Sequence, residues 1–188
     1  MITLAAVLAV GCGGEEVTAP RDKGYMRIDM PQSSYAEYDT TALPFRFELS
    51  TDARVKMLRD GKRMKTMAIE YPKCMGVVSL GYVSMKDAKE LVGQIDTSIQ
   101  LRNMHNSVST GYEEQQFVND GSKVYATVYR IKGQKVASTY QFWATDSVKH
   151  FLRGSLYIDC VPNNDSLAPV LEYLQRDVDH LVETLKWK

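Results

Sequence analysis

SKVYATVYRIKGQKVASTYQFWATDSVKHFLRGSLYIDC, residues 122–160, contains three successive stretches that are typical of β-strands. We expect strands over 122–133, 134–146 and 150–160, because each stretch is rich in β-branched and aromatic residues. Gly133 joins the first two stretches as a turn residue. Strands that follow one another through short connections pair as hairpins. The stretch therefore predicts a mainly antiparallel sheet.

Further strands are expected on the amino-terminal side of this stretch. Polar and apolar residues alternate in GYMRIDM (24–30), which Pro31 ends, and again in PFRFELS (44–50). Four more stretches have β-rich composition: 53–58, 66–72, 74–85 and 107–118. The residues 60–65 between two of them read as a turn. The chain thus has several strands before its first helix.

Two long helices are predicted, one in the middle of the chain and one at its end. The first covers residues 86–106, with Asp87 as its N-cap and an apolar face made of Ala88, Leu91, Val92, Ile95 and Ile99. The second has Ser166 as its N-cap and a continuous apolar stripe of Val170, Leu171, Leu174, Val178, Leu181, Val182 and Leu185. Strands, helix, strands and a closing helix predict an α+β fold, a mainly antiparallel sheet with two long helices packed on it.

The first 23 residues read as a lipoprotein signal followed by a tether. In MITLAAVLAVGC a short apolar run leads through Gly11 to Cys12, after which the sequence becomes polar. We expect residues 1–11 to be a signal peptide, residues 12–23 a lipidated cysteine with a flexible linker, and residues 24–188 a single α+β domain. Ala9 stands at position minus three, where Leu is commonest, and no Lys or Arg precedes the run. A short buried strand is the alternative reading of this segment.

The composition excludes some partners. Lys and Arg total 23 and Asp and Glu total 23, so no net charge attracts nucleic acid. No stretch of about 20 apolar residues is present to span a bilayer as a helix. Contact with a membrane is therefore expected through the lipid anchor only.

The two remaining cysteines, Cys74 and Cys160, fall in apolar stretches predicted to be strands. An exported domain permits a disulfide between them, but cysteine is also commonly a buried free thiol, and the sequence leaves both states open. Neither cysteine has a second Cys or a His at the spacing of zinc ligands. No metal site and no cofactor are predicted.

An enzymatic reading would start from the three histidines, His105, His150 and His180. Asp146, Ser147 and His150 superficially offer a catalytic triad, but no nucleophile-elbow motif accompanies them. Asp177, Asp179 and His180 lie close together on the last helix, where two ligands sharing a face lack a third. We expect these polar residues to be the solvated flank of the apolar stripe. The sequence predicts no catalytic residues.

The composition favours a contact surface for other proteins as the functional feature. Tyrosine and tryptophan are enriched at interfaces, and the chain has eleven tyrosines. Candidate partner-surface residues are Tyr25, Tyr35, Tyr38, Tyr112, Trp143 and Trp187. A basic cluster is expected to be a charged, exposed hairpin edge that discourages strand pairing; its members are Lys56, Arg59, Lys62, Arg63 and Lys65.

The carboxyl-terminal third, TDSVKHFLRGSLYIDCVPNNDSLAPVLEYLQRDVDHLVETLKWK (145–188), resembles the end of the gliding-motility lipoproteins GldD of Bacteroidetes. GYMRIDMP (24–31), PFRFEL (44–49), IEYP (69–72) and the lipobox cysteine occur in the same order as in that family. A tryptophan that commonly precedes the segment matching IEYP is absent here. The resemblance covers nearly the whole chain.

This resemblance implies an outer-membrane lipoprotein, facing the periplasm, that supports gliding motility and the type IX protein secretion machinery through protein–protein contacts. Its partners would be other gliding and secretion lipoproteins, and it implies no enzymatic activity. The order of elements also resembles the PsbP/Mog1 type of fold. The alternative function is a lipid-anchored enzyme or small-ligand carrier that uses a cleft beside the sheet. Single histidine-to-alanine variants that lose function without losing stability would favour that alternative.

Overall fold

The computed structural model describes residue 30 and residues 32–188, and it has two helices and two sheets in this part of the chain. The elements, in chain order, are β1 (Tyr35–Tyr38), β2 (Phe45–Ser50), β3 (Arg54–Asp60), β4 (Met64–Tyr71), β5 (Gly76–Ser84), α1 (Ala88–Asn103), β6 (Gly111–Asn119), β7 (Val124–Lys132), β8 (Tyr140–Thr145), β9 (His150–Ile158), α2 (Ala168–Thr184) and β10 (Lys186–Trp187).

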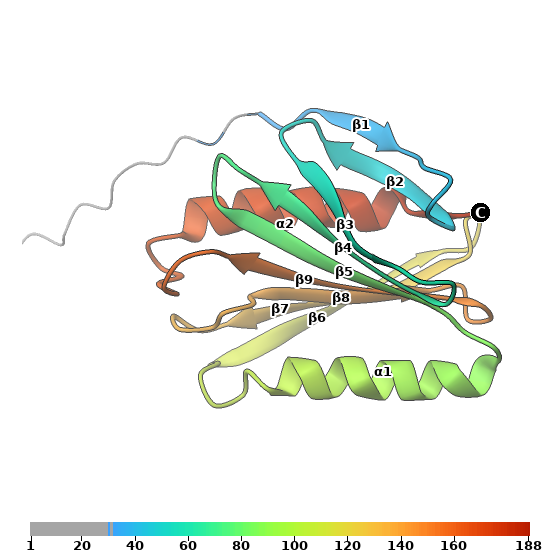
Figure 1. Ribbon diagram of the computed structural model, residues 1–188. Helices are drawn as coiled ribbons and strands as arrows, with labels where there is room; N and C mark the ends of the chain where they lie inside the picture. Colours follow the sequence, from blue (N-terminus) through green and yellow to red (C-terminus); the bar gives the residue numbers. More distant parts are fainter. Residues whose placement is uncertain (1–29, 31) are drawn as a thin grey trace, which may run out of the picture.

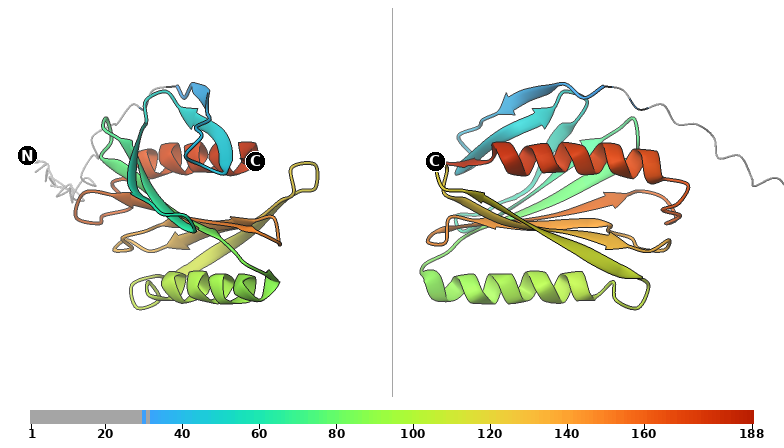
Figure 2. Two further views of the ribbon diagram at one scale, coloured as in Figure 1. Left: turned by 45° about the vertical axis from the view of Figure 1, so that its right-hand side comes forward. Right: turned by 180° about the vertical axis from the view of Figure 1, so that it is seen from behind.

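The large sheet is antiparallel throughout and has the strand order β3-β4-β5-β9-β8-β7-β6. A small sheet has the order β1-β2-β10. Helix α2 and the small sheet lie on one face of the large sheet, and α1 lies on the other (Figures 1 and 2). The α+β class, the antiparallel pairing and the two packed helices confirm the prediction.

The main core fills the space between the large sheet, α2 and β2. The apolar stripe predicted on α2 forms the side of the core that the helix contributes, and all seven stripe residues are buried. The inward side chains of β2 include Phe45 and Phe47, both at most 1% exposed. Burial of about ten large apolar side chains from one helix and one strand provides the main driving force for closing this layer onto the sheet.

Helix α1 packs more loosely than its sequence indicated. Asp87 is the predicted N-cap and accepts hydrogen bonds from the backbone N–H groups of Lys89 and Glu90. The predicted apolar face is only partly buried, however, because Ala88 and Val92 are exposed and the one buried residue of α1 is Ser98. The sheet strands below α1 offer a polar surface, in which Arg153 donates to Gln141 at 2.9 Å.

Several predicted boundaries were wrong. Helix α2 begins at Ala168 after Leu167, which makes no side-chain capping bond, so Ser166 is not the N-cap. Residues 134–139 lie outside any strand, and β6 begins at Gly111 rather than at residue 107. The sequence also missed β1 and the two-residue β10. The strand predicted over 24–30 lies outside the described residues except for Met30, which is not in a strand.

Candidate functional site

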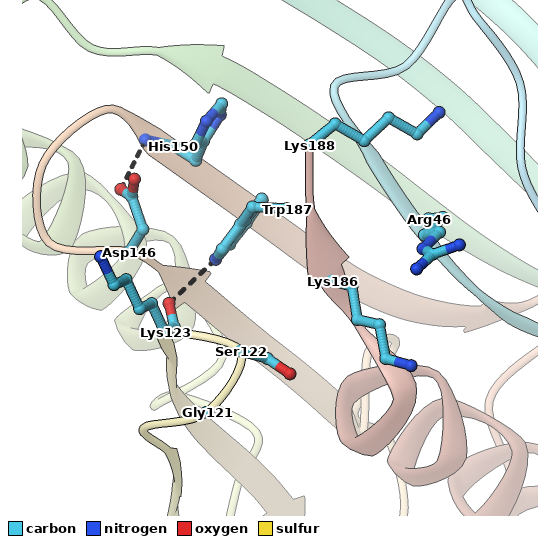
Figure 3. Close-up of a pocket in the computed structure, with 9 residues that line it drawn as sticks. All are labelled: Arg46, Gly121, Ser122, Lys123, Asp146, His150, Lys186, Trp187 and Lys188. Carbon is cyan, nitrogen blue, oxygen red and sulfur yellow. Dashed lines mark hydrogen bonds between the residues drawn. The ribbon is translucent and has the colours of Figure 1, made fainter.

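A hollow of about 390 Å³ opens at the end of the molecule where the chain terminates (Figure 3). It forms where β2, the β6–β7 turn, the β8–β9 turn and β10 meet. Its lining residues are Arg46, Gly121, Ser122, Lys123, Asp146, His150, Lys186, Trp187 and Lys188. These residues are distant in the sequence, so the hollow depends on the topology of both sheets.

Trp187 forms the centre of the hollow and connects the elements around it. It pairs with Phe45 in the β10–β2 ladder, and the two rings meet edge to face with centroids 6.0 Å apart. Its Nε1 donates to the carbonyl oxygen of Lys123 at 3.0 Å, so the indole also holds the β6–β7 turn (Figure 3). On its other side the ring stacks nearly parallel on His150, with centroids 5.1 Å apart. Trp187 is therefore held from three sides.

His150 is a buried, neutral histidine at the start of β9. It is 5% exposed, and its Nδ1 lies 2.7 Å from the hydroxyl oxygen of Tyr82. Burial lowers the pKa of His150, and the field of Asp146 opposes that shift without reversing it. Because the pKa falls below its ordinary value of about 6.5, the imidazole is uncharged at neutral pH.

Asp146 organises the β8–β9 turn. Its Oδ1 accepts hydrogen bonds from the backbone N–H groups of Val148, Lys149 and His150 at 3.0, 2.8 and 2.7 Å. Burial acts to raise the pKa of Asp146, but these three donors outweigh it and the pKa is lowered. Ser147 has a φ of 67° within the same turn. Asp146 is thus bound to backbone and the His150 ring to Tyr82, which is not the arrangement of a catalytic triad.

The rim of the hollow is cationic. Arg46 pairs with Glu37 at 3.1 Å, and Lys188 pairs with Asp39. Lys123 and Lys186 have no carboxylate partner among the described residues. The arrangement is suited to reversible contact with an acidic group and offers no activated nucleophile. Sequence reasoning missed these four cations because no local pattern connects them.

The polar residues of α2 have structural roles. Asp177 is only 3% exposed, and its Oδ1 accepts from Ser33 Oγ at 2.7 Å and from Tyr35 OH at 2.8 Å. The prediction that Asp177 lies on the solvated flank was therefore wrong. Asp179 binds Arg130 and the hydroxyl of Tyr140. These bonds attach β1 and β7 to the helix.

His180 and His105 lie apart from the hollow. His180 Nε2 lies 2.7 Å from Glu48 Oε2, and its ring stacks on Tyr35 with centroids 3.8 Å apart. His105 follows α1, where burial and the nearby Arg153 lower its pKa. Within the described residues no group of three His, Cys, Asp or Glu side chains is placed to hold a metal ion.

The predicted partner-surface residues have different surroundings. Tyr25 lies outside the described residues. Tyr35 and Tyr38 are half-buried; Tyr35 stacks on His180, and Tyr38 lies 5.5 Å from the Phe47 ring. Trp143 is half-buried under α1 and stacks on Phe151. Tyr112 on β6 is 47% exposed, with the Arg102 guanidinium 4.2 Å from its ring centre. A partner surface that includes Tyr112 and Trp187 stays a prediction.

Cys74 and Cys160 are free thiols in the structure, and a disulfide between them stays a prediction. Both lie just beyond the paired ends of β5 and β9, so the prediction that they lie within strands was wrong. Burial raises the pKa of the half-buried Cys74 thiol, whereas Cys160 is exposed. The two thiols therefore differ in accessibility.

Comparison with known families identifies the chain's relatives. Residues 15–187 match the family of the gliding motility lipoprotein GldD. The chain belongs to the GldD family. Membership in GldD implies a role in gliding motility and places the chain among lipid-anchored envelope proteins, in agreement with the sequence resemblance. No protein with a curated function matches the chain.

The fold of this GldD member is similar to that of a cyanobacterial PsbP protein. The solution structure of cyanobacterial PsbP (CyanoP) from Synechocystis sp. PCC 6803 matches with a TM-score of 0.50 and 10% sequence identity. The match covers 87% of this chain and 98% of that one. At this identity the likeness shows the fold alone and confirms the predicted PsbP-like architecture. Across the described residues, neither helix is long and apolar enough to cross a membrane.

Proposed function

We propose that the chain is an envelope lipoprotein, acylated at Cys12, that supports gliding motility and the type IX secretion machinery through protein–protein contacts. Its domain faces the periplasm from the outer membrane and contacts other lipoproteins of that machinery. Membership in the GldD family is the observation that carries the motility role.

Anchoring at Cys12 gives such contacts a physical advantage. Acyl chains contribute about 0.8 kcal/mol per buried CH₂, so two or three chains hold a protein durably on a bilayer. Confinement to one surface raises the effective concentration of any partner anchored there. A modest interface can then suffice for function. The hollow fits this role, because its Lys123 and Lys186 have no carboxylate partner among the described residues and are available to an acidic group of a partner.

A complementation experiment tests the proposal. A deletion strain should lose surface spreading and secretion of cargo, and the wild-type gene should restore both. Cys12→Ala should give a folded protein that restores neither. Cys160→Ala is the matched control, because it removes an exposed free thiol and leaves Cys12 in place. Normal spreading and secretion in the deletion strain would reject the assignment.

Metabolic labelling separates the anchor from the motility role. A palmitate analogue should label the wild type and Cys160→Ala but not Cys12→Ala. Labelling that persists in Cys12→Ala would place the lipid elsewhere. Full complementation by an unlabelled Cys12→Ala protein would mean that the domain works without its anchor.

A further inference from the structure

Strand β6 forms one edge of the large sheet, and this edge is open. It pairs with β7 over nine residues without a register shift, and no other described segment pairs with it. All of its residues except Phe117 are exposed. Figure 2 shows the β6–β7 hairpin extending beyond the sheet toward the C-terminus. A long, regular edge of this kind presents unpaired backbone groups to any second strand.

The opposite edge, β3, is protected in ways that β6 is not. The β3–β4 register shifts between Met57 and Arg59, and β3 also carries Arg54 and Lys56. Bulges and cationic side chains are the usual devices that block pairing at a free edge. The sequence of β6, GYEEQQFVN, contains no Lys, Arg or Pro. One sheet thus has a blocked edge and an unblocked one.

Strand β6 itself carries acidic side chains and no basic ones, although Arg102 and Arg130 reach it from neighbouring elements. Glu113 and Glu114 lie on β6, and Asp120 follows it. Glu183 on α2 lines the same hollow as Asp120. Only Glu113 among these four has a cationic partner, Lys132, within the described residues. A second copy pairing through β6 would bring four glutamates into one ladder, which disfavours self-association and favours a basic strand.

A hollow beside β6 could hold one side chain of such a strand. Its volume is about 330 Å³, and its lining residues are Phe117, Val118, Asn119, Asp120, Val124, Val182 and Glu183. Phe117 and Val182 offer an apolar wall, and Asp120 and Glu183 offer carboxylates. A lysine or arginine can bury its stem against apolar atoms while its charged head remains near carboxylates.

We propose that β6 is a docking edge for an extended, lysine- or arginine-bearing segment of a partner protein, which adds to the large sheet as an eighth strand. Backbone hydrogen bonds would supply affinity, and the acidic hollow would select one basic side chain of the docked strand. The proposal rests on the proposed function in one respect only, namely that the chain acts through protein contacts.

Hydrogen exchange with a peptide probe tests the docking edge. The full chain in detergent is mixed with a nine-residue peptide of alternating lysine and valine. Exchange should slow over 111–119 and stay unchanged over 54–60. A twin peptide with glutamate in place of lysine should bind at least about tenfold more weakly. The lysine peptide N-methylated at two adjacent residues near its centre should lose binding, because N-methylation removes the backbone donors.

Two charge reversals on α2 provide a matched pair. Glu183→Lys should weaken binding about threefold, whereas Glu172→Lys, an exposed position outside the β6 hollow, should leave it unchanged. Glu114→Lys, which places a lysine on the edge itself, should weaken binding further. Unchanged melting temperatures establish that the variants fold.

Four outcomes would overturn the docking edge: no slowing over 111–119, equal slowing over 54–60, undiminished binding of the N-methylated peptide, or a dimer of the chain that protects β6 without peptide. Failure of the motility role is distinguishable. If the deletion abolishes spreading but Glu114→Lys and Glu183→Lys, shown to block the peptide, restore it fully, the motility role stands and the docking edge falls.

Discussion

Gly154→Ala should be among the most destabilising single-methyl additions in this molecule. Gly154 lies in β9 between Leu80 of β5 and Phe142 of β8, which are its direct cross-strand partners. A Cβ at Gly154 would lie 2.0 Å from Cε1, 2.4 Å from Cζ and 2.7 Å from Cδ1 of the Phe142 ring. The Phe142 ring is 1% exposed and belongs to the closely packed main core, so it cannot move aside to make room for the added methyl group.

The expected cost is about 3 kcal/mol of unfolding free energy, the upper end of the range for overpacked cores. For a chain of this size each kcal/mol lowers Tm by about 2–4 °C, so Tm should fall by about 6–12 °C. Chemical denaturation at constant temperature measures the free energy, and a thermal scan measures Tm. The unfolding free energy and Tm should both decrease.

Gly81→Ala is the matched control. Gly81 lies in the neighbouring strand β5, and a Cβ there would meet no atom within 4 Å. We expect a change within about 0.5 kcal/mol, or a small gain from reduced freedom of the unfolded chain. Combining Gly154→Ala with Phe142→Leu should recover about 1 kcal/mol or more relative to the sum of the single changes. Equal stability of the two glycine variants, or strict additivity with Phe142→Leu, would refute the steric reasoning.

Three further predictions concern stability and accessibility. The pKa of His150 is lower in the folded chain than its ordinary value of about 6.5. The folded chain should therefore have its full stability above about pH 6.5 and lose stability as the pH decreases below that value. Between about pH 7.5 and 5, the Tm of the wild type should fall more steeply with decreasing pH than the Tm of His150→Gln. A maleimide should label exposed Cys160 before half-buried Cys74, as peptide mapping of a time course would reveal, and equal rates would contradict the burial. Asp177→Ala should cost about 2–3 kcal/mol in chemical denaturation because two hydroxyl donors lose a buried acceptor, whereas Glu172→Ala on the exposed side of α2 should cost little.

The sequence predicted features that depend on neighbouring residues. The α2 stripe follows from helical spacing, and the Asp87 cap follows from one side chain reaching the N–H groups two and three residues further on. Spacing could also have indicated the burial of Asp177, which lies three residues after Leu174 and four before Leu181. The polarity of Asp177 outweighed that signal in the prediction. The hydrogen-bond partner of Asp177, Tyr35, is 142 residues away in the sequence.

Features that depend on distant strands could not be predicted in the same way. The apolar spacing of α1 indicated a buried face, yet the sheet beneath it is partly polar, so the helix packs loosely. Strand β10 has two residues, which is too short to show a period, although its Trp187 connects the small sheet to both turns of the hollow. The cations of the hollow come from separate elements that only the fold brings together.

The two faces of the large sheet differ in how tightly they are packed. On the α2 face, the buried stripe and the bonds of Asp177 and Asp179 fix the helix and β1 to the strands. On the α1 face the apolar cluster is smaller, consisting of Tyr129, Ile131 and Val136, and Arg102 reaches from the helix to stack on Tyr112 of β6 and Tyr129 of β7. Weakly packed elements open at lower free energy than core strands. A strand added at β6 would therefore meet the part of the fold that can adjust to it, while the opposite layer keeps the domain intact.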